Sequence, residues 1–176
     1  LRSKGEKRFL PFLLNGAKKL ELAGADFLVL PCNTLHIFIN AIRNSVKIPV
    51  LSIVEETAGK LEKEGVRRIG ILATSSTLRS RIHNNQLLKA KIEPVLPSIS
   101  DQKEIDLLIN KIVTGRQNIR AQSKLKQIVK RFKSRGVNNI LLACTDLQLV
   151  FPNIPGVKIH DTMNILAEAT VRDIFT

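Results

Sequence analysis

The chain has 176 residues, of which 44% are hydrophobic, so it can build one large domain or two small ones around a real core. Only 4% are aromatic, with no Trp and no Tyr, so that core must be aliphatic. The net charge of +13 favours anionic ligands or surfaces, whereas no apolar stretch approaches the ~20 residues that span a membrane. No signal peptide is visible and two cysteines are too few for a disulfide scaffold, so we expect a cytoplasmic protein. Because the first residue is Leu1 rather than Met, we expect a fragment, a processed form or a trimmed chain.

Helices and strands are predicted to alternate along the chain. Apolar residues recur at helical spacing in seven segments, 7–23, 34–44, 55–64, the stretch from the turn at 74–77 to about 89, 100–114, 119–134 and 162–175. Short apolar runs predict six strands, at 26–30, 49–54, 68–73, 92–96, 139–143 and 157–160. Such alternation predicts an α/β protein with parallel strands covered on both faces. Six strands and seven helices are crowded for one sheet, so two sheets that share a cleft fit better.

The expected crossovers between these sheets lie near residues 53–55 and 160–162. They would divide the chain into an outer α/β domain, residues 1–53 plus 162–176, and an inner α/β domain, residues 54–161. No low-complexity linker separates the two.

Positive charge is concentrated from Lys111 to Arg135, where nine Lys or Arg occur without any Asp or Glu. Four apolar residues in this stretch recur at helical spacing, namely Leu125, Ile128, Val129 and Phe132. We therefore interpret it as an amphipathic helix with solvated cations. Binding of nucleic acid or another polyanion is the weaker interpretation, since no zinc-finger spacing and no aromatic stacking platform accompany it.

Two cysteines, 112 residues apart, occupy matching places. Cys32 ends the apolar run that begins at Asp26, and Cys144 ends the run that begins at Asn139. Small polar residues follow both. Each thiol therefore falls where a strand meets a following helix, at the carboxyl end of a parallel sheet, where α/β proteins place ligands.

Two opposed thiols suit a reaction that removes a proton from one face of a carbon and returns one to the other face. A helix N-terminus can lower a cysteine pKa, so we expect Cys32 and Cys144 to alternate as base and acid. The competing interpretations are two small buried hydrophobes and a disulfide between them.

Several polar residues at the predicted helix starts could donate hydrogen bonds to a substrate carboxylate. They are Asn33, Thr34, Thr74, Ser75, Ser76, Thr77 and Thr145. Ordinary helix capping is the alternative role for each. His36, His83 and His160 lack metal-ligand spacing, so we expect packing or surface roles for them, and no nucleotide-binding loop is present.

Around these cysteines the sequence resembles the aspartate/glutamate racemase family. The matching segments keep the family's order and cover nearly the whole chain. They are Gly24-Ala25-Asp26, Pro31-Cys32-Asn33-Thr34-Leu35-His36, Ile48-Pro49-Val50-Leu51-Ser52-Ile53-Val54-Glu55, Gly70-Ile71-Leu72-Ala73-Thr74 with Thr77, Cys144-Thr145-Asp146-Leu147 and Asp161-Thr162.

The resemblance implies two pseudo-symmetric α/β domains with the active site between them. It also implies racemisation of aspartate, glutamate or a related amino acid without pyridoxal phosphate or metal, commonly by a homodimer. Cys32 and Cys144 would be the catalytic pair, with aspartate favoured over glutamate.

The chain departs from the family pattern in four places. The opening strand and Gly-rich turn are absent, Val113 stands where a Lys is expected, Leu166 stands where a His is common, and Asp146 replaces the commoner Glu. Two alternatives therefore stay open: a related dicarboxylic-acid isomerase or decarboxylase that uses one cysteine, and a truncated member that acts as a binding or scaffold protein.

Overall fold

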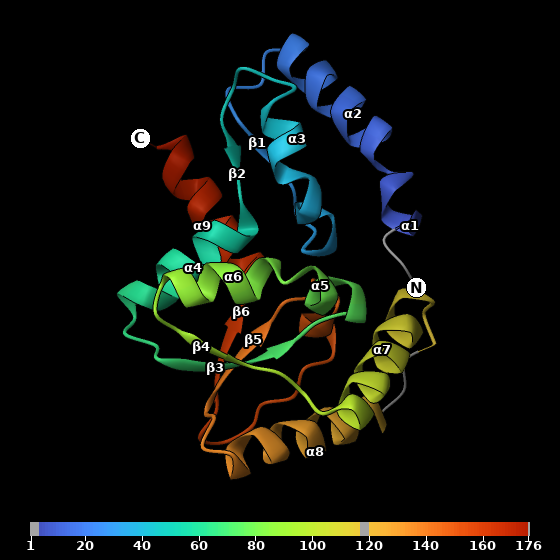
Figure 1. Cartoon of the computed structure of the whole chain (residues 1–176), viewed down its shortest axis with the longest axis vertical. Helices are drawn as coiled ribbons and strands as arrows, with labels where there is room; N and C mark the ends of the chain where they lie inside the picture. Colours follow the sequence, from blue (N-terminus) through green and yellow to red (C-terminus); the bar gives the residue numbers. More distant parts are fainter. Residues whose placement is uncertain (1–3, 117–119, 176) are drawn as a thin grey trace.

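A computed structural model describes residues 4–116 and 120–175. Within them the strands form two separate parallel sheets (Figure 1). The small sheet pairs β1 (Leu28–Val29) with β2 (Val50–Leu51). The large sheet has the order β4-β3-β5-β6, with β3 at Arg68–Leu72, β4 at Glu93–Val95, β5 at Asn139–Leu142 and β6 at Lys158–Asp161. The predicted α/β class with two parallel sheets is confirmed.

The helices cover these sheets in the predicted order. They are α1 (Lys4–Lys7), α2 (Leu10–Leu22), α3 (Ile39–Arg43), α4 (Ile53–Lys63), α5 (Ser75–Ser80), α6 (Ile82–Lys89), α7 (Ile99–Val113), α8 (Arg120–Ser134) and α9 (Thr162–Ile174), with 3-10 turns η1 (Thr34–Phe38) and η2 (Leu147–Leu149). The helix predicted over 34–44 is thus a 3-10 turn followed by a short α-helix. The helix predicted to residue 89 is broken at Arg81, whose φ of 57° is left-handed. The predicted start of α8 at Ile119 lies outside the described residues.

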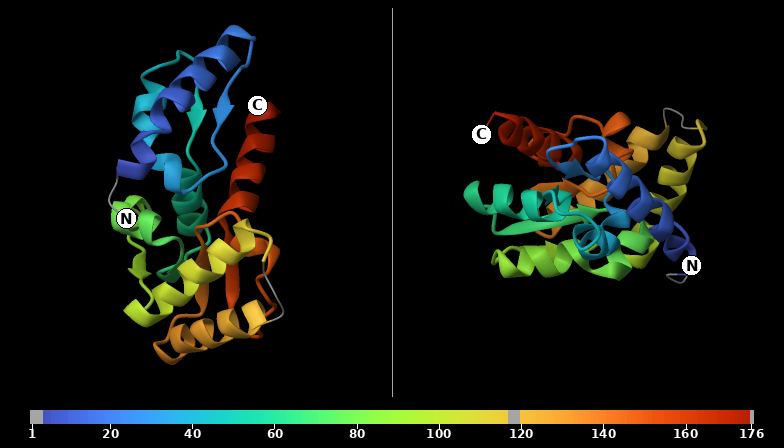
Figure 2. Two further views of the ribbon diagram at one scale, coloured as in Figure 1. Left: turned by 90° about the vertical axis from the view of Figure 1, so that its right-hand side faces the viewer. Right: turned by 90° about the horizontal axis from the view of Figure 1, so that it is seen from above.

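The small sheet packs against helices on both sides, although Val29 of β1 is 39% exposed. Leu28 and Val50 pack with Ala17 of α2 and Ile42 of α3. Leu51 faces the other way, where it packs against α4 and α9 (Figure 2, left). Because successive side chains alternate across a strand, two-residue strands suffice to anchor both layers.

The large sheet also separates two apolar layers. Ile69 and Ile71 of β3 pack with α4 and α6, whereas Leu72 packs with α7 and α8. Phe132 of α8 lies directly over Gly70, where a Cβ atom would come within 2.8 Å of the phenyl ring. The glycine therefore allows α8 to lie close to the sheet.

Helix α8 is amphipathic, as the sequence predicted. Its stripe is buried, at Leu125, Ile128, Val129 and Phe132. Several of its cations are engaged with the rest of the chain: Lys124 bonds Glu104 of α7 at 2.8 Å, and Arg131 bonds Asp101 of α7 at 2.5 Å. Part of the positive charge thus fastens α8 to α7.

Helices α4 and α9 join the two sheets. Ile53 and Val54 of α4 pack with Leu166 and Ala169 of α9, in the same cluster as Leu51 of the small sheet. The chain therefore passes between the sheets twice, through α4 and from β6 into α9. These passages lie at the predicted crossovers, while the domain boundaries at 53 and 162 stay a prediction.

Candidate active site

The segment that carries Cys32 follows β1 and is anchored by a histidine. The carbonyl of half-buried Cys32 accepts a hydrogen bond from Nδ1 of His36 at 2.7 Å. Nε2 of His36 accepts the backbone N–H of Ile53, the first residue of α4, at 3.1 Å. Because a carbonyl only accepts, the proton is on Nδ1 and the ring is neutral. Burial lowers the pKa of His36, which also favours the neutral ring.

Cys144 lies two residues beyond β5 in a more enclosed place. Cys144 is 7% exposed, and its Sγ donates to Oδ2 of Asp146 at 3.8 Å. Burial raises the pKa of Cys144 to about 11. The sequence predicted that a helix follows this strand, where its N-terminus could lower the pKa, and for Cys144 that prediction was wrong. Only the 3-10 turn η2 follows, and its backbone N–H groups offset the burial too little.

Three of the predicted substrate-binding threonines meet in one hydroxyl cluster. Oγ1 of Thr34 lies 2.9 Å from Oγ1 of Thr77 and 3.3 Å from Oγ1 of Thr74, and the last two lie 3.0 Å apart. Thr34 follows the small sheet, whereas Thr74 and Thr77 follow β3 of the large sheet. The cluster therefore brings together predicted site residues that follow each of the two sheets. Thr74 also caps α5 by accepting the N–H of Thr77 at 3.2 Å, so capping and substrate binding are compatible here.

The two predicted serines are held by side chains that the sequence analysis did not single out. Asp106 of α7 accepts the N–H of Ser75 at 2.8 Å and also its hydroxyl. Glu6 of α1 accepts the hydroxyl of Ser76. Gln102 of α7 supports the same turn by donating to Asp106 at 3.1 Å. Both serine hydroxyls are thus committed to protein carboxylates, which favours a role in shaping the turn over direct contact with substrate.

Asn33 is buried, and both the nitrogen and the oxygen of its side-chain amide are hydrogen-bonded. Its Nδ2 donates to Oγ1 of Thr162 at 3.0 Å, and its Oδ1 lies 2.7 Å from Nε2 of His83. Thr162 in turn donates to the carbonyl of Leu142, two residues before Cys144, at 2.9 Å. Hydrogen bonds therefore connect the residue after Cys32 to the strand that carries Cys144.

The remaining predicted site residue, Thr145, is half-buried between Cys144 and Asp146. All three histidines, His36, His83 and His160, are buried and hydrogen-bonded, as a packing role requires. Both cysteines are free.

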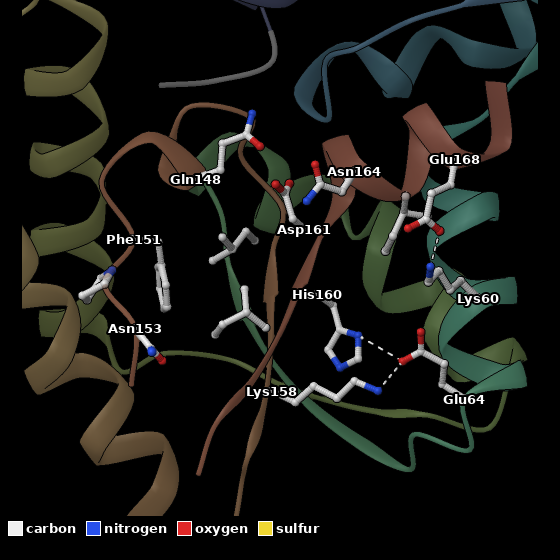
Figure 3. A pocket seen from close by; sticks show the side chains of 14 residues that line it. Lys60, Glu64, Gln148, Phe151, Asn153, Lys158, His160, Asp161, Asn164 and Glu168 are labelled. Atoms are coloured by element: carbon white, nitrogen blue, oxygen red, sulfur yellow. Dashed lines mark hydrogen bonds and ion pairs between the residues drawn. The ribbon is translucent and has the colours of Figure 1, made fainter. Parts of the chain in front are cut away.

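A cavity of about 470 Å³ lies elsewhere, beside the edge strand β6 (Figure 3). Glu64 holds Lys158 at 2.7 Å and approaches Nδ1 of His160 at 3.6 Å there, while Lys60 pairs with Glu168. Neither cysteine lines this cavity, so we do not assign it to the chemistry of the thiols.

Within residues 4–116 and 120–175, no three His, Cys, Asp or Glu side chains come together as metal ligands. No helix among the described residues has the length and apolarity needed to cross a bilayer.

Two parallel sheets, each with a strand that leads into a cysteine and small polar residues, define a class of α/β proteins with one thiol beyond each sheet. The profile of the Asp/Glu/Hydantoin racemase family matches residues 3–170. The chain therefore belongs to the Asp/Glu/hydantoin racemase family. Membership places it among the amino-acid racemases, which are isomerases, and confirms the predicted class of enzyme.

Individual proteins that the chain resembles are also racemases by name. The chain is 31% identical to the broad specificity amino-acid racemase RacX of Bacillus subtilis over 160 residues, which are 90% of this chain and 69% of RacX. The aspartate racemase structure from Picrophilus torridus superposes with a TM-score of 0.81 and 26% identity, over 93% of this chain and 68% of that one. The chain spans only about half of glutamate racemases such as that of Prochlorococcus marinus, which is 28% identical over 81% of this chain and 54% of its own length.

Proposed function

We propose that the protein racemises a small acidic amino acid, aspartate in preference to glutamate, by proton transfer at Cα between Cys32 and Cys144 and without a cofactor. The observation that carries this proposal is the cluster of Thr34, Thr74 and Thr77. It joins a hydroxyl that follows the small sheet to two that follow the large sheet, and its first member lies two residues from Cys32.

The proton balance of the reaction is simple. The thiolate of Cys32 takes the Cα proton from one face of the substrate and leaves a carbanion, to which the thiol of Cys144 returns a proton on the opposite face. With a pKa of about 11, Cys144 is protonated at neutral pH and is ready to donate. One turnover leaves Cys32 as a thiol and Cys144 as a thiolate, so the reverse reaction starts from that state.

The threonine cluster supplies hydroxyl donors for the substrate carboxylate. Each hydroxyl has one proton, and within the cluster these protons are shared among three oxygens. A bound carboxylate can accept hydrogen bonds that the hydroxyls otherwise make to one another. Charge-assisted bonds of this kind are roughly twice as strong as neutral ones, which favours the exchange.

Incubation with L-aspartate in deuterated water tests the proposal. We expect D-aspartate to appear with deuterium at Cα, and we expect Cys32→Ser and Cys144→Ser each to suppress it strongly. Thr114→Val is the control, because among the described residues that exposed hydroxyl bonds to its own helix, to the carbonyls of Asn110 at 2.8 Å and Lys111 at 3.4 Å. Full activity in either cysteine variant would refute the two-base assignment.

A second candidate is a dicarboxylic-acid isomerase or decarboxylase that uses one cysteine. The unequal settings of the thiols favour it, since Cys32 is half-buried while burial raises the pKa of Cys144 to about 11. Turnover of maleate or of a malonate analogue by the wild type, without racemisation of aspartate, would select this candidate.

The proposal includes a homodimer in a reducing cytoplasm. Two free cysteines fit such a compartment. Apolar side chains stay exposed on the last turn of α9, at Val171 and Ile174, and at Phe175 directly after it. A mass near twice 19.6 kDa in light scattering would support the dimer, and a monomer at micromolar concentration would exclude it.

A polyanion partner has less support, because Lys124 and Arg131 of the basic stretch are bonded within the protein.

A further inference from the structure

A row of buried hydrogen bonds starts at His83 and ends at the strand before Cys144. His83 of α6 meets Asn33 at 2.7 Å, Asn33 meets Thr162 at 3.0 Å, and Thr162 meets the carbonyl of Leu142 at 2.9 Å. His83, Asn33 and Thr162 are each 3% exposed or less. The row joins four segments that are far apart in the sequence, and two of them carry the candidate catalytic thiols.

The direction of each bond in this row follows from its last member. The Leu142 carbonyl can only accept, so the Thr162 hydroxyl donates to it and accepts from the Asn33 amide. The oxygen of the same amide then faces His83, whose Nε2 must carry the proton. No other arrangement gives each of these three bonds one donor and one acceptor.

His83 can act in this row only as a neutral donor. Burial lowers its pKa to about 3. Its Nδ1 is buried without a hydrogen-bond partner among the described residues, so a proton there would have no acceptor. His36, on the other side of the same segment, is a neutral ring of the opposite tautomer that holds the Cys32 carbonyl. Two neutral histidines thus fix consecutive residues, Cys32 and Asn33.

We propose that His83 is a positioning residue, which acts through the Asn33 amide to hold the Cys32 segment in register with Thr162 and with the strand that carries Cys144. This inference rests on the proposed racemase function. His83 does not touch the substrate in this scheme. It sets where one thiol lies relative to the other, which two-sided proton transfer requires.

Removing either end of the row tests this role. His83→Phe removes the donor, His83→Gln keeps an N–H group at a similar reach, and Thr162→Val removes the other end at nearly constant volume. We expect His83→Phe and Thr162→Val to lower kcat about 10- to 100-fold, as for a small misplacement of a reacting group, with little change in KM. His83→Gln should restore most of kcat. The double variant should lose less than the product of the two single effects, because both break one network.

His160→Phe is the matched control. That histidine is also buried and also bonds an asparagine Oδ1, that of Asn139 at 3.0 Å, but it lies on β6 and outside the row. We expect it to lower the melting temperature while kcat stays near the wild-type value. Equal losses of kcat in His83→Phe and His160→Phe would mean that general destabilisation explains both, and would overturn the proposal.

A second readout needs no racemase activity. In the Cys144→Ser background, iodoacetamide reports the reactivity of Cys32 alone. His83→Phe should change the alkylation rate or its pH midpoint, His83→Gln should restore it, and His160→Phe should leave it unchanged. Unaltered alkylation in His83→Phe would exclude positioning of Cys32. If the wild type does not racemise, the proposed function fails, while this readout still decides the role of His83.

Discussion

The buried neutral state of His83 gives a quantitative prediction for the pH dependence of stability. The folded-state pKa of His83 is about 3, whereas an unfolded histidine titrates near 6.5. A lowered histidine pKa means that the folded state disfavours the proton. The resulting stability is therefore fully present above pH 6.5 and is lost as the pH falls toward 3. Linkage between pH 7.5 and pH 5 then gives a loss of about 2 kcal/mol from this residue alone.

Urea unfolding followed by far-UV circular dichroism measures this loss. We compare wild type with His83→Gln at pH 7.5 and pH 5, and we expect the drop in the free energy of unfolding to be about 2 kcal/mol smaller in the variant. Part of the wild-type drop should persist, because burial lowers the pKa values of His36 and His160 in the same direction. Leu88→Gln, an exposed position on α6, is the control and should keep the full drop.

The result that refutes this reasoning is also clear. If wild type and His83→Gln lose the same free energy between pH 7.5 and pH 5, His83 either accepts a proton in the folded state or is not enclosed. In that case the hydrogen-bond directions assigned to the row of His83, Asn33 and Thr162 would also be wrong.

Three further predictions follow from other contacts. Thr77→Val removes the buried hydroxyl that bonds Thr34, so we expect steady-state kinetics to show a rise of about tenfold in KM for aspartate. An unchanged KM would exclude the threonine cluster from substrate binding. Gly70→Ala forces a methyl group within 2.8 Å of the Phe132 ring, so it should lower the free energy of unfolding in urea by about 1–3 kcal/mol. A second substitution, Phe132→Leu, should recover part of that loss. An unchanged free energy of unfolding in Gly70→Ala would contradict this packing. In a Cys32→Ser background, the thiolate absorbance of Cys144 should titrate near pH 11, and a midpoint below pH 8.5 would show that burial does not control this thiol.

The central strands β3 and β5 of the large sheet were predictable because they are almost wholly apolar. Runs such as Ile69–Leu72 and Ile140–Leu142 are buried on both faces, so their sequence signal is strong. The small sheet was harder to delimit. Only two residues of each predicted strand form the ladder between β1 and β2, although their apolar runs are longer.

Local helix geometry was less predictable. Arg81 adopts a left-handed φ of 57° without a glycine or proline nearby to signal the break between α5 and α6. The 3-10 form of η1 coincides with the long-range bond from His36 to Ile53, which no local pattern reveals. At η1 a tertiary contact thus accompanies the departure from the expected regular helix.

Some residues of the candidate site were predictable from the sequence, and others were not. The cysteines and the threonines stood out because each follows an apolar run, and the structure joins Thr34, Thr74 and Thr77. The partners of Ser75 and Ser76 could not be found from sequence, because Asp106 and Glu6 are ordinary helix-surface carboxylates there, 31 and 70 residues away.

The two passages of the chain between its sheets have a mechanical consequence. One passage enters α4 at Ile53, whose N–H is bonded by His36, and the other enters α9 at Thr162, which is bonded by Asn33. A hinge rotation that parts the two sheets would turn about these same points. The segment from Cys32 to His36 is therefore tied to both passages, so that a change in the angle between the sheets would also displace the Cys32 thiol.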